Sequence, residues 1–242
     1  MRIELDTHVH SVASGHAYST IYEITNAAKQ KGLKIIALTD HGPNMPGAPH
    51  LWYFGNLKEL PPYINGVRVL KGIEANIKDY EGNIDIPLQY QKSLEFILAS
   101  FHDACVEPGT VEQHTQAAVK ALQNPFVDAI AHPGNAQFQV DIDEVVKAAK
   151  KYGKFIEINN HSFFVRQGSE ENCFLFAKKC AQHGTNIICG SDSHFCETVG
   201  QFKKVIEVLE KAGVPEELVF STSKDKFEYY LHSRKKRILE II

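Results

Sequence analysis

Short apolar runs alternate with amphipathic helical segments along the whole chain of 242 residues, and this alternation limits the folds open to it. The apolar runs are near-continuous, which is typical of strands covered on both faces in a parallel sheet. After a first strand that leads into Asp6, we expect strands at residues 34–39, 67–73, 94–100, 127–131, 154–158 and 186–189. A strand–helix alternation of this length fits a (β/α) barrel or an open doubly wound sheet.

The segments between these strands have the spacing of amphipathic helices. The first, at residues 21–31, ends at Gly32, a residue type that favours the left-handed conformation at a helix C-terminus. Further helices are expected at residues 111–122, 141–152, 169–183, 202–212 and 224–237, the last two as an outer layer. Because no linker, low-complexity tract or internal repeat interrupts the pattern, we predict a single domain spanning residues 1–242.

The residues after the first strand favour the barrel over the open sheet. A nucleotide-binding open sheet would carry a glycine-rich turn at this position. The chain instead continues as Asp6-Thr7-His8-Val9-His10. The predicted fold is therefore an α/β barrel of the TIM-barrel type.

Nearly every predicted strand ends in residues that can bind a metal ion. These residues are His8, His10, His16, Asp40, His41, Glu74, His102, Asp103, His132, Glu157, His161, Asp192 and His194. Since the carboxyl ends of barrel strands meet at one rim, these imidazoles and carboxylates should share one cleft. Burying so many ionisable groups would be costly without a cation to neutralise them. In His8-x-His10, as in the later Asp-x-His pair, side chains two residues apart on an extended chain point the same way.

Composition limits the partners and the cellular setting. The formal net charge is −3, and no basic groove interleaved with aromatic residues is evident, so a nucleic-acid partner is not expected. No segment is apolar for long enough to cross a membrane, and the N-terminus lacks a signal-peptide pattern. The five cysteines include no Cys-x-x-Cys pair, which predicts a reducing, cytoplasmic setting. The apolar outer helices would permit assembly into a homo-oligomer.

Other polar and aromatic features are interpreted as structural. Four histidines lie away from strand ends, and we expect them to be structural or solvent-facing: His50, His114, His183 and His232. The basic run at residues 234–237 is interpreted as the solvated end of a helix. The loop at residues 42–55 is rich in proline and aromatic residues and is expected to shape the mouth of the cleft. Its aromatic side chains would form either a substrate platform or loop packing.

Four short motifs resemble those of the PHP family, named for polymerase and histidinol phosphatase domains. They are Asp6-Thr7-His8-Val9-His10-Ser11, Leu38-Thr39-Asp40-His41-Gly42, His132-Pro133-Gly134 and Ser191-Asp192-Ser193-His194. The motifs occur in order over nearly the whole chain, and segments 72–76 and 157–160 look closest to the YcdX-type phosphatases. The resemblance implies a distorted barrel of seven β/α units. It also implies a site for three divalent metal ions, usually zinc, with manganese or iron in some relatives.

The resemblance implies nine ligands for these three ions. One ion would be bound by His8, His10, Glu74 and Asp192. A second would be bound by His16, His41 and His194, and the third by Glu74, His102 and His132, so that Glu74 bridges two ions. The nine donors are nitrogen and oxygen atoms, a set that suits zinc, manganese or iron. The sequence departs from the YcdX-type pattern at His161, where a small polar residue is expected.

The predicted function is hydrolysis of a small phosphomonoester by a metal-bound hydroxide at this trinuclear site. Metal ions make such a hydroxide available because they lower the pKa of bound water from about 15.7 to near 7. Arg166 is a candidate for binding the phosphate through two parallel hydrogen bonds, and His161 for protonating the leaving oxygen. Four carboxylates beside the ligands are candidates for orienting imidazoles: Asp6, Asp40, Asp103 and Glu157.

Three alternatives remain open. A phosphodiesterase or 3′–5′ nuclease is one, because polymerase-associated relatives edit DNA ends, although the balanced charge counts against it. An amide or lactone hydrolase of the metal-dependent barrel type is another, but such enzymes usually carry a lysine ligand at a strand end, and none is found here. A metal-binding protein without catalysis is the third, and the low number of ligands per ion counts against it.

Overall fold

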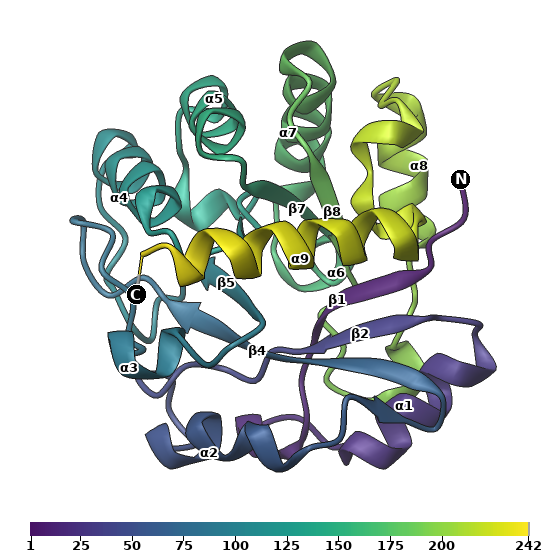
Figure 1. Ribbon diagram of the computed structural model, residues 1–242. Coiled ribbons are helices and arrows are strands. Elements are labelled where there is room, and N and C mark those ends of the chain that lie inside the picture. Colours follow the sequence, from purple (N-terminus) through teal and green to yellow (C-terminus); the bar gives the residue numbers. More distant parts are fainter. Residues whose placement is uncertain (242) are drawn as a thin grey trace.

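The strands expected from the apolar runs are present in a computed structural model of the protein, which describes residues 1–241. They are β1 (Leu5–Val9), β2 (Ile35–Leu38), β4 (Val67–Asn76), β5 (Phe96–Ser100), β6 (Ala129–Ile130), β7 (Phe155–Asn159) and β8 (Ile187–Gly190). These seven strands are parallel and pair in this order, while β3 (Tyr63–Ile64) runs antiparallel to β4. The prediction of a distorted barrel of seven β/α units in one α/β domain is confirmed (Figure 1).

The barrel closes between β8 and β1 over only part of its height. Near the carboxyl ends of the strands, the amide of Asp192 donates to the carbonyl of His8, and the amide of His10 donates to the carbonyl of Ser193, both at 2.9 Å. Lower in the barrel, the turn η6 (Phe220–Thr222) lies between the two strands. Ser221 accepts there from the amides of Glu4 and Cys189, each at 2.8 Å. The closing contacts therefore bring the first and last histidine motifs side by side.

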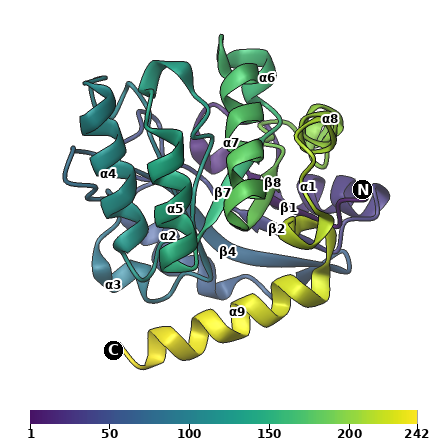
Figure 2. The ribbon, with the colours of Figure 1, turned by 90° about the horizontal axis from the view of Figure 1, so that it is seen from above.

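Helices surround the barrel close to their predicted positions. The longer ones are α1 (Ile21–Gln30), α4 (Val111–Gln123), α5 (Ile142–Tyr152), α7 (Ser169–His183) and α8 (Lys203–Lys211). Capping boxes at Thr20 and Thr110 start α1 and α4, because each hydroxyl accepts from the amide three residues on. Gly153 and Gly184 end α5 and α7 in the left-handed conformation. In Figures 1 and 2, α4, α5, α7 and α8 follow one another around one side of the barrel.

Short helical segments lie in the connections. These are η1 (Val12–Ser14), α2 (Leu51–Asn56), η2 (Leu57–Glu59), α3 (Leu88–Gln91), η3 (Ala136–Phe138), α6 (Ser162–Val165), η4 (Cys196–Thr198) and η5 (Glu216–Leu218). The segment expected as a loop at residues 42–55 therefore contains most of a helix. Within residues 1–241, no helix has both the length and the apolar character needed to span a membrane.

The last helix, α9 (Lys224–Leu239), is not part of the outer layer in which it was predicted. It crosses the end of the barrel where the strands begin (Figures 1 and 2). Its Phe227 and Leu231 pack with Leu5, Phe96 and other inward-facing strand residues in one buried cluster. A helix whose apolar residues close a barrel end must bury one face there, which explains why α9 lies across the strands.

The interpretation of the basic run at residues 234–237 as a solvated helix end is wrong for Arg234. This side chain is buried, and its Nε lies 2.6 Å from Asp128 Oδ1. Its two terminal nitrogens donate to the carbonyls of Leu94 and Phe126 at 3.0 and 2.9 Å. Arg234 therefore anchors α9 beneath the barrel, whereas the next two residues of the run are exposed.

Candidate metal centre

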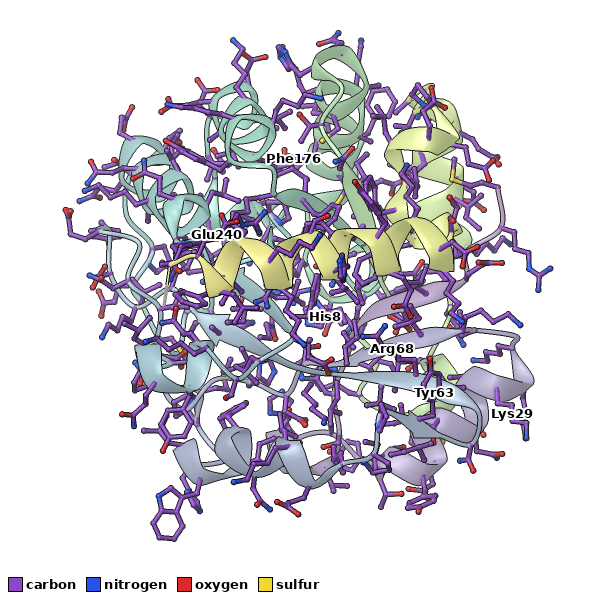
Figure 3. All side chains as sticks on the ribbon, viewed as in Figure 1. His8, Lys29, Tyr63, Arg68, Phe176 and Glu240 are labelled. Carbon is purple, nitrogen blue, oxygen red and sulfur yellow. The ribbon has the colours of Figure 1, made fainter. Side chains whose placement is uncertain are left out.

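The histidine and carboxylate side chains predicted at strand ends come together at the carboxyl end of the barrel. His8 lies on β1 near the middle of the molecule (Figure 3). Glu74 lies on β4 and is fully buried, and His132 and Asp192 follow β6 and β8. Parallel strands that end at one rim bring these distant residues into one cluster.

One group has the spacing of a tetrahedral metal site. His8 Nε2 and His10 Nε2 are 3.0 Å apart. Glu74 Oε2 lies 3.4 and 3.5 Å from these two nitrogens, and Asp192 Oδ1 lies 3.6 and 3.3 Å from them. Ligands about 2.0–2.1 Å from a tetrahedral zinc ion are separated by roughly 3.3–3.4 Å. The four atoms therefore lie at separations suited to one such ion.

The second carboxylate oxygen of Glu74 faces another pair of histidines. Glu74 Oε1 lies 2.7 Å from His132 Nε2 and 3.4 Å from His102 Nε2. Because the two oxygens of this carboxylate face different imidazoles, Glu74 is placed to bridge two ions.

The remaining predicted ligands complete a continuous cluster. His41 Nε2 lies 3.2 Å from His16 Nε2, and the ring of His194 stacks on that of His16 with centroids 5.0 Å apart. The ring of His194 also stacks on that of His10 at 4.3 Å. Four overlapping sets of side chains have atoms close enough to hold an ion, and three of them contain only predicted ligands. The nine residues thus adjoin one another rather than forming three separate sites.

Two buried atoms in the cluster fit the presence of cations. Among the residues that the structure describes, Glu74 Oε2 and His41 Nδ1 are buried without a hydrogen bond, although they lie only 2.7 Å apart. An unsatisfied buried carboxylate oxygen and an unsatisfied imidazole nitrogen are both costly. Divalent cations would satisfy such donors, so the residues present fit a metal site.

The other ring nitrogens of the histidines are held by neighbouring side chains. His8 Nδ1 lies 2.9 Å from Glu157 Oε1, and His102 Nδ1 lies 2.7 Å from Asn76 Oδ1. His10 Nδ1 lies 3.1 Å from Ser14 Oγ, which donates to Asp40. These partners turn Nε2 of each ring toward the cluster, as second contacts do around protein metal ions.

The four carboxylates predicted to orient imidazoles differ in what they do. Glu157 contacts an imidazole directly, and Asp40 acts on His10 through a serine. Asp6 accepts from backbone amides, including that of Ser191 at 2.9 Å, so it holds the loop rather than a ring. The prediction is wrong for Asp103, which is exposed and accepts from Gln137.

Asn76 was not predicted to have such a role. It follows Glu74 by two residues on the same strand, so its side chain faces the same way. That spacing was a signal in the sequence. Its Nδ2 donates to Asp85 Oδ2 at 2.6 Å, which fixes the amide with its oxygen toward His102.

Burial and neighbouring charges set the protonation of the imidazoles. Burial lowers the pKa of His10 well below its usual value and lowers the pKa of His132 to about 4. Burial also acts to lower the pKa of His8, but the carboxylates of Glu157 and Glu74 raise it well above its usual value. The surroundings of His8 thus favour a positive charge at that position, whether a proton or a metal ion carries it.

The two carboxylates of the cluster are held in the ionised form. Burial acts to raise the pKa of Glu74, but His8 and His102 lower it well below its usual value. Burial acts in the same way on Asp192, and His8 and Arg166 lower the pKa of its carboxyl well below the usual range. Ionised carboxylates and neutral imidazoles are the forms that bind metal ions.

The backbone is unusual at two of the predicted ligands. His132 has a φ of 32° and Asp192 a φ of 55°, a region that non-glycine residues seldom adopt. Such strain persists where surrounding contacts enforce it and is concentrated at functional sites. At Gly190, a Cβ atom would lie 2.0 Å from Glu157 Oε1 and 2.5 Å from His8 Cβ, so the close approach of β8 to this site requires glycine.

His161 and Arg166 lie at the rim of the cluster, on and just after α6. Arg166 Nη1 is 3.1 Å from both Asp192 Oδ2 and Ser162 Oγ. His161 Nδ1 is 3.8 Å from Asp192 Oδ2, and its side chain is partly exposed. Burial lowers the pKa of His161, against the opposing effect of Asp192. Both residues can therefore be reached from solvent while facing the carboxylate of a predicted ligand.

The histidines predicted to be structural or solvent-facing lie outside the cluster. His114 is buried and accepts from the amide of Gly109 at 2.7 Å, and His183 pairs with Asp143 near the surface. His50 caps the start of α2, and His232 is exposed. That prediction is confirmed.

The aromatic loop before β3 combines packing with exposure. The hydroxyl of Tyr53 donates to Asp40 Oδ2 at 2.5 Å, so this residue supports the carboxylate behind His10. Trp52 is 77% exposed and makes no such contact with the cluster. Loop packing is thus the observed role of Tyr53.

Comparison with known proteins adds the family and the fold. Residues 6–161 match the family model described as PHP domain. The chain is 55% identical over 238 residues to a protein of Acetivibrio thermocellus named probable phosphatase, covering 98% of this chain and 99% of that one. A histidinol phosphate phosphatase of Lactococcus lactis, solved with zinc, L-histidinol and phosphate, superposes with a TM-score of 0.61 at 18% identity, covering 88% of this chain and 94% of that one.

A chain from archaeal ribonuclease P, solved with mature tRNA, has the same TM-score of 0.61 at 10% identity, covering 96% of this chain and 91% of that one. At such low identities, the two superpositions show a shared fold alone. Proteins that carry this fold therefore differ in what they bind.

Proposed function

Since the chain belongs to the PHP family, we propose that it is a metal-dependent phosphatase that hydrolyses a small phosphomonoester. The observation that carries the proposal is the fully buried Glu74, whose two oxygens face separate histidine groups at 2.7–3.6 Å spacings shared with Asp192. The name of the A. thermocellus relative, which is similar over nearly its whole length, supports phosphate esters as substrates.

The site would hold three divalent ions, with zinc the first choice. His8, His10, Glu74 and Asp192 would hold one, His16, His41 and His194 a second, and Glu74, His102 and His132 the third. Zinc in the Lactococcus protein supports this choice, as do the nitrogen and oxygen donors. When bound, such ions polarise phosphoryl oxygens and lower the pKa of water, so that a nucleophile is available at neutral pH.

The chain itself would bind and orient the ester. Arg166 points its guanidinium at Asp192 Oδ2 from the rim, where it can pair with a phosphate oxygen. His161 is proposed to protonate the leaving oxygen. Its lowered pKa makes it a stronger acid, with a smaller protonated fraction at neutral pH. A kcat of His161→Ala equal to that of the wild type would remove this role.

The intracellular setting is also proposed. All five cysteines are free in the described part of the chain, which supports a reducing compartment such as the cytoplasm. A nucleic-acid substrate is not favoured, because the net charge is −3.

Hydrolysis of two chromogenic esters tests the proposed function. We expect metal-loaded protein to hydrolyse p-nitrophenyl phosphate and to lose this activity after chelation, with little turnover of the bis(p-nitrophenyl) diester. Turnover of the diester alone would instead favour a phosphodiesterase or nuclease. If metal is bound but neither ester is hydrolysed, the phosphatase proposal fails.

A further inference from the structure

A polar cleft of about 410 Å³ opens beside the metal cluster, between the loops that follow β5, β6 and β7. Its lining includes His102, a proposed metal ligand, and Arg166, the proposed phosphate-binding residue. Small-molecule sites typically have volumes of about 300–1,000 Å³, so the cleft is large enough for a metabolite. A phosphate bound between the metal cluster and Arg166 would direct the rest of the ester into this space.

The lining of the cleft is rich in uncharged hydrogen-bonding groups. Gln137 Nε2 donates to Asp103 Oδ2 at 3.2 Å, which links two of the loops, and Asn135 Oδ1 accepts from the amide of Gln137 at 3.1 Å. Within residues 1–241, no protein group bonds to Asn135 Nδ2, to Gln137 Oε1 or to the side-chain amide of Gln167. Donors and acceptors are therefore both available to a ligand in the same cleft.

This mixture of donors and acceptors matches the chemistry of hydroxyl groups. A hydroxyl donates one hydrogen bond and accepts others, so a carbon chain with several hydroxyls pairs well with side-chain amides. Asp103 is the one carboxylate of the lining and Arg166 its one fixed cation, so the cleft is not strongly charged. Phe101, stacked on Phe138 at 5.1 Å, and the exposed Val165 supply apolar surface for the C–H faces of such a molecule.

We propose that this cleft binds the leaving group of the substrate, and that the leaving group is polyhydroxylated, as in a hexose phosphate. The inference rests on the proposed phosphatase function, because the phosphate end of the ester is placed at the metal cluster. It assigns Gln137 and Gln167 to substrate selection.

Comparison of two esters in matched variants tests this inference. The measured quantity is kcat/KM for glucose 6-phosphate divided by kcat/KM for phenyl phosphate. We expect this ratio to fall about fivefold in Gln137→Met and in Gln167→Met, since each variant removes hydrogen bonds to a hydroxyl but keeps side-chain length. The control Gln123→Met, exposed on α4 away from the cleft, should leave the ratio unchanged. An unchanged ratio in both cleft variants overturns the proposal.

A competing chemistry is an amine in the leaving group, bound by Asp103. The wild-type protein would then prefer phosphoethanolamine over glucose 6-phosphate, and this preference would overturn the proposal. The expected result is the reverse order, with Asp103→Asn having little effect on the hexose ester because an amide oxygen still accepts from a hydroxyl.

A binding measurement separates this inference from the proposed function. Saturation-transfer NMR on metal-free protein should show contact with the ring protons of glucose 6-phosphate, and weaker contact in Gln167→Met. Hydrolysis of phenyl phosphate without ring contact or sugar preference overturns the inference and leaves the phosphatase proposal standing. Ring contact without hydrolysis of any ester by loaded protein supports the cleft assignment and overturns the phosphatase proposal.

Discussion

At the scale of single residues, Glu74 is the centre of the proposed site. It is fully buried, yet its carboxylate faces imidazoles on both sides instead of a lysine or arginine. Burial opposes its ionisation, and the neighbouring histidines reverse that effect. The same principle extends one contact outward, where Glu157, Asn76 and Ser14 hold the second nitrogens of three rings. Residues that touch no substrate thus govern how well the site binds metal.

Glu157→Gln tests this outer layer. The variant removes the charge that His8 Nδ1 faces at 2.9 Å, so the ring is held and polarised less well. We expect metal affinity to fall about 10–100-fold, measured by competition with a chelator. Glu170→Gln, an exposed carboxylate on α7, is the matched control and should bind metal like the wild type. Equal affinities in both variants would contradict the assigned role of Glu157.

Arg166→Ala tests the proposed phosphate contact. Loss of a charge-assisted hydrogen bond costs about 1.5–3 kcal/mol, which corresponds to a KM for p-nitrophenyl phosphate about 10–100-fold higher. Metal content, measured on the same sample, should be unchanged, and Arg166→Lys should recover only part of the loss. An unaltered KM would exclude Arg166 from the site.

At the scale of elements, α9 shows how a helix closes the end of the barrel opposite the metal cluster. Phe227 and Leu231 complete the buried cluster inside the strands, and Arg234 pairs with the fully buried Asp128. The hydroxyl of Tyr230 donates to the same carboxylate at 2.6 Å. The position of α9 therefore depends on apolar packing and on one buried ion pair.

Arg234→Met tests this dependence. Removing one partner of a buried ion pair leaves the charge of Asp128 uncompensated, and we expect a loss of about 3–5 kcal/mol in the free energy of unfolding. Urea denaturation measures this loss. Lys236→Met, exposed on the same helix, should change the stability by less than about 0.5 kcal/mol. A similarly small change in Arg234→Met would show that α9 is held by its apolar residues alone.

At the scale of the whole molecule, the sequence predicts the barrel well because each parallel strand is a continuous apolar run with its own helix. It also predicts which side chains meet, since barrel topology brings all strand ends to one rim. The position of α9 was not predictable in this way, because amphipathic spacing shows that a helix buries one face without identifying what covers it. The role of Asn76 depends on the orientation set by Asp85, a contact between segments that no local pattern encodes.

The metal content of the purified protein tests the central claim most directly. Plasma mass spectrometry of the metal-loaded wild type should give three divalent ions per chain, because Glu74 can bridge two ions and the remaining histidines adjoin it. His102→Ala, which removes one proposed ligand of the third ion, should bind two. One ion or none in the wild type would contradict a trinuclear site built around Glu74.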